Sequence, residues 1–200
     1  MASDASPRRL VLATHNEGKR RELEQLLRGS PYAPIPCARF GVTEPDETAA
    51  DYVGNAILKA RHVALATGMP ALGDDSGLDI EAAPDVLGVH TARWIRDHGG
   101  RAAAFDTLRA RLGLDLDRPR AFVAHLRCAL ALVHPDDPEP RVGEGSVAGW
   151  LRWPPTQLPG PAAVFECDGA PLETNGVLLP RRLAFAALSD VLSARGIPVA

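Results

Sequence analysis

Strand-like and helix-like segments alternate along this chain, and that alternation constrains its fold more than any other feature. The apolar run at residues 10–13 suits a buried strand, and the leucines within residues 23–27 follow it at helical spacing. Two long strand candidates, residues 121–133 and 143–153, come later and are expected to pair in antiparallel fashion. Strands that alternate with helices and end in one hairpin-like pair predict an α/β fold with a mixed sheet.

The other elements follow from the same periodicity and from the positions of glycine and proline. The expected elements are helices at 50–67, 101–112 and 183–192, strands within 31–46 and at 78–80, and a loop at 154–163. A chain of 200 residues fits one domain. We therefore expect residues 1–7 to form a flexible tail and residues 8–200 to form a single domain.

Composition excludes several classes of function. The net charge is −3, without the basic excess that is typical of nucleic-acid binding. No stretch approaches the about 20 apolar residues of a membrane span, and the N-terminus lacks the apolar run of a signal peptide. The cysteines Cys37, Cys128 and Cys167 are odd in number and form no CxxC pair, which argues against a disulfide framework or a structural zinc. We expect a cytoplasmic protein that binds neither nucleic acid nor membranes.

The first strand–loop–helix segment has the character of an anion site. A helix that opens directly after a strand presents free backbone N–H groups and the positive end of its dipole at the loop. Thr14 and Asn16 can add hydrogen bonds there, and Lys19 can add a charge. A lysine in the first turn opposes the helix dipole, so its position favours a nearby phosphate. The alternative, an N-cap with a solvated lysine, stays open at this point.

Asp74 and Asp75 are the second feature with chemical content. Two adjacent aspartates after an apolar segment are costly to bury, and a divalent cation removes that cost. Mg²⁺ prefers one or two carboxylates together with water and substrate phosphates. The alternative is a turn, because Asp, Ser and Gly all favour turns.

Glu47 and Lys59 are weaker candidates by themselves. If one helix ran continuously between them, they would lie ~18 Å apart and would serve different parts of a long ligand. Glu47 would then suit a metal, and Lys59 would suit a phosphate or the surroundings of a general base.

Four segments resemble, in the same order, motifs of the inosine triphosphate pyrophosphatase family, also called the non-canonical purine NTP pyrophosphatases. They are LATHNEGK at 12–19, NAILKARH at 55–62, PALGDDSGL at 70–78 and GVHTAR at 88–93. The resemblance covers about residues 8–152. It implies an elongated mixed sheet flanked by helices, of the inosine triphosphatase/Maf-like type, with two lobes, a central cleft and a homodimeric assembly.

The resemblance also implies residue roles. Its phosphate-binding positions are Thr14, Asn16, Lys19, Lys59, Ser76 and Arg93. Its metal-binding positions, for Mg²⁺ with Mn²⁺ as a substitute, are Glu47, Asp74 and Asp75. Asp75 would act as the general base, and Lys59 would be catalytic beside it.

The last quarter of the chain departs from the family pattern. The family normally has a Gly-Phe-Gly-Tyr-Asp-Pro segment, then a lysine and a Ser-His-Arg motif that read the purine base. Here the nearest stretch is PGPAAVF at 159–165, no lysine follows Lys59, and only Arg181 matches the last motif. The base-reading groups are lost while the phosphate and metal groups remain. We therefore expect the divergent residues 154–182 to give the enzyme an altered base specificity. The aromatic and acidic residues that could line a rebuilt pocket, or pack in the core, are Trp150, Trp153, Phe165 and Glu173.

The sequence therefore predicts a metal-dependent enzyme that hydrolyses a nucleoside triphosphate to a monophosphate and pyrophosphate. Two alternatives stay open. One is a nucleotide-binding homologue without catalysis, and the other is a hydrolase of a different nucleotide phosphoanhydride.

Overall fold

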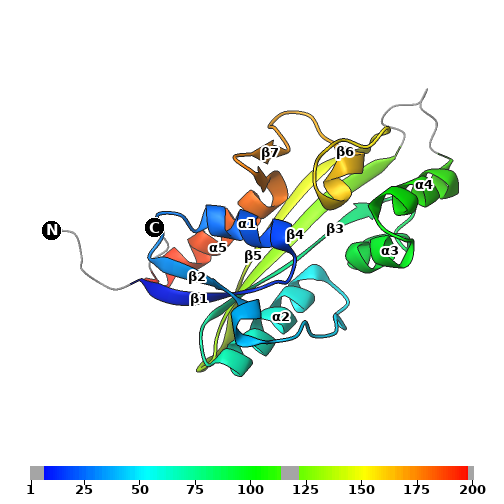
Figure 1. The fold of residues 1–200 in the computed structure, drawn as a ribbon. Helices are drawn as coiled ribbons and strands as arrows, with labels where there is room; N and C mark the ends of the chain where they lie inside the picture. Colours follow the sequence, from blue (N-terminus) through cyan, green and yellow to red (C-terminus); the bar gives the residue numbers. More distant parts are fainter. Residues whose placement is uncertain (1–6, 114–121, 198–200) are drawn as a thin grey trace.

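The computed structural model describes residues 7–113 and 122–197, which form an elongated α/β molecule (Figure 1). The first half contains β1 (Arg8–Ala13), α1 (Glu17–Leu26), β2 (Tyr32–Pro36), η1 (Cys37–Phe40), α2 (Tyr52–Thr67), β3 (Ala71–Ile80), α3 (Thr91–Asp97) and α4 (Arg101–Leu112). The second half contains β4 (Val123–His134), β5 (Asp137–Leu151), η2 (Gly160–Val164), β6 (Phe165–Glu166), β7 (Glu173–Thr174), β8 (Val177–Leu178) and α5 (Leu179–Ala194).

The central sheet is mixed and has six strands in the order β2-β1-β3-β4-β5-β6. β2 and β3 run parallel to β1, whereas β4, β5 and β6 join in antiparallel fashion. β4 and β5 pair from Val123 opposite Trp150 to Leu132 opposite Arg141, with a register shift beyond it, so the expected late antiparallel pair is confirmed. The α/β class with a mixed sheet is likewise confirmed.

Helices cover both faces of the first half of the sheet (Figure 1). Alternate strand residues therefore enter two different cores, as the period of two in a strand requires. Leu12 and Leu130 pack with α1 and α5, and their neighbours Val11 and Ala129 pack with α2. Burial on both faces explains why these strands read as continuous apolar runs rather than as alternating ones.

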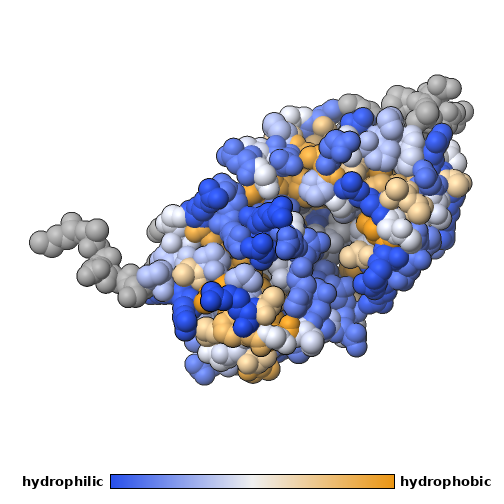
Figure 2. All heavy atoms as spheres, viewed as in Figure 1, coloured by the Kyte–Doolittle hydropathy of each residue, from blue (hydrophilic) through white to orange (hydrophobic). Residues whose placement is uncertain are grey.

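The long strands β4 and β5 continue into the other end of the molecule, where α3, α4 and η2 pack around a third core (Figure 1). Phe105 and Leu108 of α4 are buried there against Phe165 of β6. The two ends, with a hollow between α1 and α3 (Figure 2), agree with the expected two-lobed arrangement. Among the helices of the described ranges, none is long and apolar enough to cross a bilayer.

Two differences from the sequence-based expectation affect the site. Residues 71–80 form one continuous strand, so Asp74 and Asp75 lie within β3 and not in a turn. α2 begins only at Tyr52, where the side chain of Asp51 accepts a hydrogen bond from the backbone N–H of Gly54 at 2.7 Å. Glu47 therefore lies in the loop before α2, where the chain is free to fold back toward the sheet.

Smaller differences concern the ends of elements. The expected helix 101–112 coincides with α4, but α3 was not expected, because its seven residues give too short a periodic pattern. The closing helix begins at Leu179, before the expected start at 183, with proline in its first turn. The expected loop at 154–163 contains the start of η2. Most of the expected tail, residues 1–6, and the first residue of the strand expected at 121–133 lie outside the described residues.

Candidate active site

The loop between β1 and α1 has the structure of an anion site. Asn16 caps α1, and its side-chain oxygen accepts a hydrogen bond from the backbone N–H of Lys19 at 3.1 Å. The hydroxyl of Thr14 accepts a bond from the backbone N–H of Asn16 at 3.2 Å, which shapes the turn. The helix start faces the hollow between the two ends of the molecule, so an anion there would meet the positive end of the α1 dipole.

On the α2 side of β3, Lys59 joins two carboxylates. Its ammonium nitrogen lies 2.5 Å from Oε1 of Glu47 and 2.8 Å from Oδ1 of Asp75. It also donates to the backbone carbonyl of Asp74 at 3.1 Å. The ~18 Å that one continuous helix would put between Glu47 and Lys59 does not apply, because the chain before Tyr52 is a loop and not helix.

Burial and charge shape the titration of this group. Burial raises the pKa of Asp75 above its ordinary value, and the charge of Lys59 opposes that rise only in part. Burial would also raise the pKa of Glu47, but its hydrogen bond to Lys59 lowers it below the ordinary value. Although burial disfavours the ammonium form, the Asp75 carboxylate raises the pKa of Lys59, so the lysine stays charged.

On the opposite side of β3, Asp74 belongs to a different set of charges. Arg181 of α5 donates from Nε to Oδ2 of Asp74 at 2.8 Å, and Lys19 lies 2.6 Å from Oδ1. Arg181 also pairs with Glu22 of α1 at 2.6 Å. The thiol of Cys128 donates to Oδ2 of Asp74 at 3.3 Å. Burial would raise the pKa of Asp74, but the two cations hold it far below its ordinary value.

The structure does not bring the three expected metal ligands together. Within residues 7–113 and 122–197 no three His, Cys, Asp or Glu side chains form a ligand cluster. The carboxylates of Glu47 and Asp75 both contact the ammonium group of Lys59, so they lie close together. Two carboxylates, completed by water and phosphate oxygens, suit Mg²⁺. These two residues fit a divalent cation, whereas Asp74 faces the other side of β3 and is already paired with two cations.

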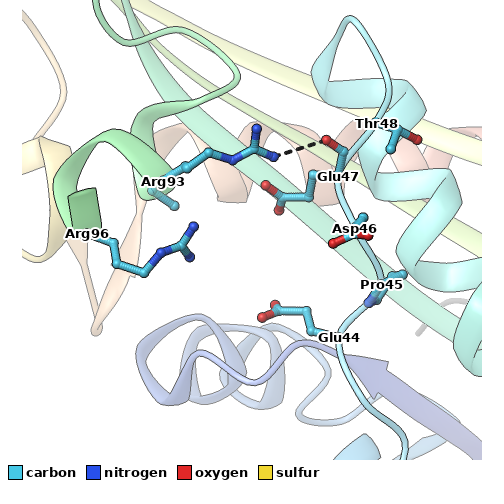
Figure 3. A pocket seen from close by; sticks show the side chains of 8 residues that line it. Glu44, Pro45, Asp46, Glu47, Thr48, Arg93 and Arg96 are labelled. Atoms are coloured by element: carbon cyan, nitrogen blue, oxygen red, sulfur yellow. Dashed lines mark hydrogen bonds between the residues drawn. The ribbon is translucent and has the colours of Figure 1, made fainter.

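Two cavities border this region. One, of about 550 Å³, lies between α3 and the loop before α2, with Arg93 and Arg96 facing Glu44 and Glu47 (Figure 3). Arg93 donates to the backbone carbonyl of Glu47 at 3.2 Å, which ties α3 to that loop. The other, of about 290 Å³, starts at α1 and passes Ser76, whose hydroxyl accepts a bond from Arg181 at 3.4 Å.

The structure adds two polar residues that the sequence-based site lacked. The amide of Asn55, fully buried on α2, donates to Oδ2 of Asp75 at 3.3 Å and accepts from the backbone N–H of Ala49 at 3.0 Å. Its spacing of four residues from Lys59 on one helix face was a signal that could have found it. The ion pair of Glu22 had no comparable signal, because its partner Arg181 lies 159 positions away in the chain.

The aromatic and acidic residues expected to line a rebuilt pocket do not line the cavity of about 290 Å³. Phe165 is buried in the core and Glu173 is exposed on β7. Trp153 packs against the same core, with the guanidinium of Arg109 5.4 Å from the centre of its ring. The 290 Å³ cavity is lined instead by Pro159, Gly160 and Pro161 of this segment, so the interpretation of the aromatic residues as pocket walls is not supported.

A mixed α/β sheet with a helix start open to a hollow, beside a buried carboxylate–lysine group, is the arrangement of an enzyme that acts on phosphate anhydrides. The model of the Ham1 family matches residues 10–160. The chain is 43% identical over 146 residues to the dITP/XTP pyrophosphatase of Rhodospirillum centenum, covering 73% of this chain and 71% of the relative.

Solved structures agree with these matches. The HAM1 protein from Coxiella burnetii superposes with a TM-score of 0.75 at 32% identity, covering 94% of this chain and 99% of that chain. The nucleoside-triphosphatase or dITP/XTP pyrophosphatase from Mycobacterium abscessus gives a TM-score of 0.64 at 33% identity, covering 94% and 97%. The chain belongs to the Ham1 family. It is therefore a nucleoside triphosphate pyrophosphatase, a hydrolase of acid anhydrides, and the resemblance in its motifs is confirmed.

Proposed function

We propose that this enzyme is a metal-dependent pyrophosphohydrolase that cleaves a nucleoside triphosphate between the α- and β-phosphates. The observation that carries the proposal is that Lys19 and Lys59 lie on opposite faces of β3, each beside one of two adjacent strand residues. Lys19 contacts the Asp74 carboxylate at 2.6 Å, and Lys59 contacts the neighbouring Asp75 at 2.8 Å. A triphosphate bound at this point of β3 would contact a cation, the start of α1 and a buried carboxylate.

The phosphates would be held by the α1 side of the site. The N-terminal N–H groups of α1 and the dipole of the helix favour an anion beside Asn16 and Lys19. Ser76 lines the same cavity, and Thr14 holds the turn that positions Asn16. Arg93, which lines the 550 Å³ cavity beside Glu47, would add a second contact for the phosphate tail.

Glu47 and Asp75 would hold the divalent cation, with Mg²⁺ preferred and Mn²⁺ as a substitute. When bound, the cation neutralises charge on the phosphate oxygens. Asp75 would take the proton of the attacking water. Burial raises the pKa of Asp75 above its ordinary value, which makes its carboxylate a stronger base. Lys59 would keep both carboxylates oriented, and Asp74 would position Lys19 and Arg181 from the other face of β3.

Base specificity, assembly and location complete the proposal. The relatives are named dITP/XTP pyrophosphatases, but residues 154–182 lack the base-reading groups of the family pattern. We therefore propose that other residues read the base here, with altered specificity as the result. We also propose a homodimer, as in the family pattern, with a nucleoside triphosphate as its partner and no nucleic acid. The cytoplasm is the proposed location, because the substrate is found there and the three cysteines are free.

The test is a turnover panel with Mg²⁺ over inosine, xanthosine, the four common ribo- and the four common deoxynucleoside triphosphates. Pyrophosphate and orthophosphate are counted separately. The proposal expects pyrophosphate from at least one nucleotide and a loss of about 10²–10⁴-fold in kcat for Asp75→Asn. Asp85→Asn, an exposed aspartate paired with Arg111, is the matched control and should retain full activity. Orthophosphate as the first product would point to another anhydride, and a folded, metal-binding protein without turnover would point to a binding homologue.

A further inference from the structure

The cavity of about 290 Å³ has two chemically different ends. The end at α1 is polar and is lined by Asn16, Lys19 and Ser76. The other end is mainly apolar and is lined by Ala92, Ile95, Pro159 and Pro161. The charged side chain at this other end is Arg101 at the start of α4, and α4 packs at the end of the sheet away from α1 (Figure 1).

If the phosphates occupy the polar end, the base of the nucleotide falls at the apolar end. The volume is close to the lower limit of about 300 Å³ for small-ligand pockets, and aliphatic side chains and proline rings suit the flat faces of a base. Apolar walls alone do not distinguish one base from another of similar size. Selection between bases therefore depends on the polar side chains that reach this end.

Most of the polar side chains along this cavity are already engaged. Arg181 and Glu22 pair with one another at 2.6 Å. The hydroxyl of Thr91 donates to the backbone carbonyl of Gly88 and accepts from the backbone N–H of Leu78. Arg101 differs from these residues because it is exposed toward the cavity and uses one guanidinium nitrogen to donate to the carbonyl of Leu158 at 3.2 Å. A guanidinium carries five N–H donors, so Arg101 retains donors for a ligand.

The bond to Leu158 also fixes where Arg101 points. It joins the start of α4 to the segment just before Pro159 and Pro161, which line the same cavity. A side chain held in this way loses less conformational entropy when a ligand arrives than a free surface arginine would. The guanidinium is thus held at the apolar end as a fixed set of donors.

We propose that Arg101 is the residue that selects the base in this enzyme, and that it favours bases with a carbonyl oxygen on the exposed edge. This inference rests on the proposed nucleotide site. A guanidinium only donates, so it pairs with an oxo group and with a neighbouring ring nitrogen acceptor, as arginine does on the O6/N7 edge of guanine. An exocyclic amine at the same position, as in adenine or cytosine, places donor against donor. Oxo-purines and uracil would be accepted, and their amino counterparts would be rejected.

The experiment compares two pairs of nucleotides that differ in this one group. Inosine and adenosine triphosphates form the purine pair, and uridine and cytidine triphosphates form the pyrimidine pair. The full chain should favour the oxo member of each pair by about tenfold or more in kcat/KM. In Arg101→Gln the glutamine amide both donates and accepts, so each preference should fall to within about threefold, mainly through KM. Arg111→Gln, on the same helix and paired with Asp85, is the matched control and should keep both preferences.

Binding of the monophosphate products, inosine against adenosine monophosphate, is measured by calorimetry as a second readout. A chain that hydrolyses nothing but binds the inosine compound more tightly, with the preference lost in Arg101→Gln, would support the role of Arg101 while overturning the proposed reaction. An unchanged preference in Arg101→Gln would overturn the role of Arg101. An equal loss for all four triphosphates would also overturn it, because Arg101 would then bind the shared phosphates. A native chain without any preference in turnover or in binding would overturn it too.

Discussion

The carboxylates of Asp74 and Asp75 lie on opposite faces of β3, although the two residues are neighbours in the chain. Asp75 meets Lys59 of α2, and Asp74 meets Arg181 of α5. The reason is the period of two in a strand, which sends successive side chains to opposite faces. In the proposed mechanism, Asp75 would hold the metal and take a proton from water, and Asp74 would organise the cations on the other face.

This separation predicts different effects on metal binding. Asp75→Asn should abolish the binding of Mg²⁺ that calorimetry measures in the absence of nucleotide, because one of two carboxylate ligands is lost. Asp74→Asn should leave that affinity within about threefold, because Asp74 faces away from the pair. A loss of Mg²⁺ binding in Asp74→Asn equal to that in Asp75→Asn would instead place all three carboxylates around the metal.

Asn55 is predicted to position Asp75 rather than to contact substrate. Asn55→Ala removes the hydrogen bond to Asp75 and the bond to the backbone of Ala49, so the base and the Glu47 loop both lose orientation. We expect kcat to fall about 10–100-fold, the range found for residues that orient metal ligands, with a much smaller change in KM. Steady-state kinetics at saturating Mg²⁺ checks this, with Leu65→Ala on the exposed face of α2 as control. A fall in stability without a change in kcat would contradict the positioning role.

Arg181 is predicted to be a large contributor to stability. Arg181→Met leaves the buried carboxylates of Asp74 and Glu22 without their shared cation. Breaking a buried pair of this kind costs about 3–5 kcal/mol in the free energy of unfolding. Urea unfolding measures the loss. Arg195→Met, which breaks an exposed pair with Glu139, should change stability far less. Similar losses of unfolding free energy in the two variants would contradict the prediction. They would show that Asp74 and Glu22 are not costly to bury without Arg181.

Gly73 is predicted to set the distance between α2 and β3. A β-carbon at this position would lie 2.2 Å from the carbonyl oxygen of Ala56, which is backbone and cannot turn away. Gly73→Ala should therefore push α2 outward, at a cost of about 1–3 kcal/mol in stability. Because α2 carries Lys59 and Asn55, kcat should fall as well. Thermal unfolding and turnover test both effects, and normal activity with normal stability would refute the constraint.

Local patterns in the sequence predicted much of the fold. The helix at 101–112 and the antiparallel pair β4 and β5 were found because periodicity is a local property. The strand that carries Asp74 and Asp75 was not found in full, because Asp, Ser and Gly favour turns when considered locally. Pairing with β4 along the whole of β3 and burial between two helix layers keep residues 71–80 extended.

For the site, the sequence by itself determined which chemical groups are present: a helix start with Asn16 and Lys19, a pair of aspartates, a glutamate and a lysine. It also determined the family, through motifs in a fixed order. Only the tertiary structure decided how those groups combine, because contacts such as Arg181 with Glu22 join distant parts of the chain. The alternation of side chains along a strand between two helix layers then divided the charges into two sets. Local sequence cannot show that division, because it depends on which helix covers each face of the sheet.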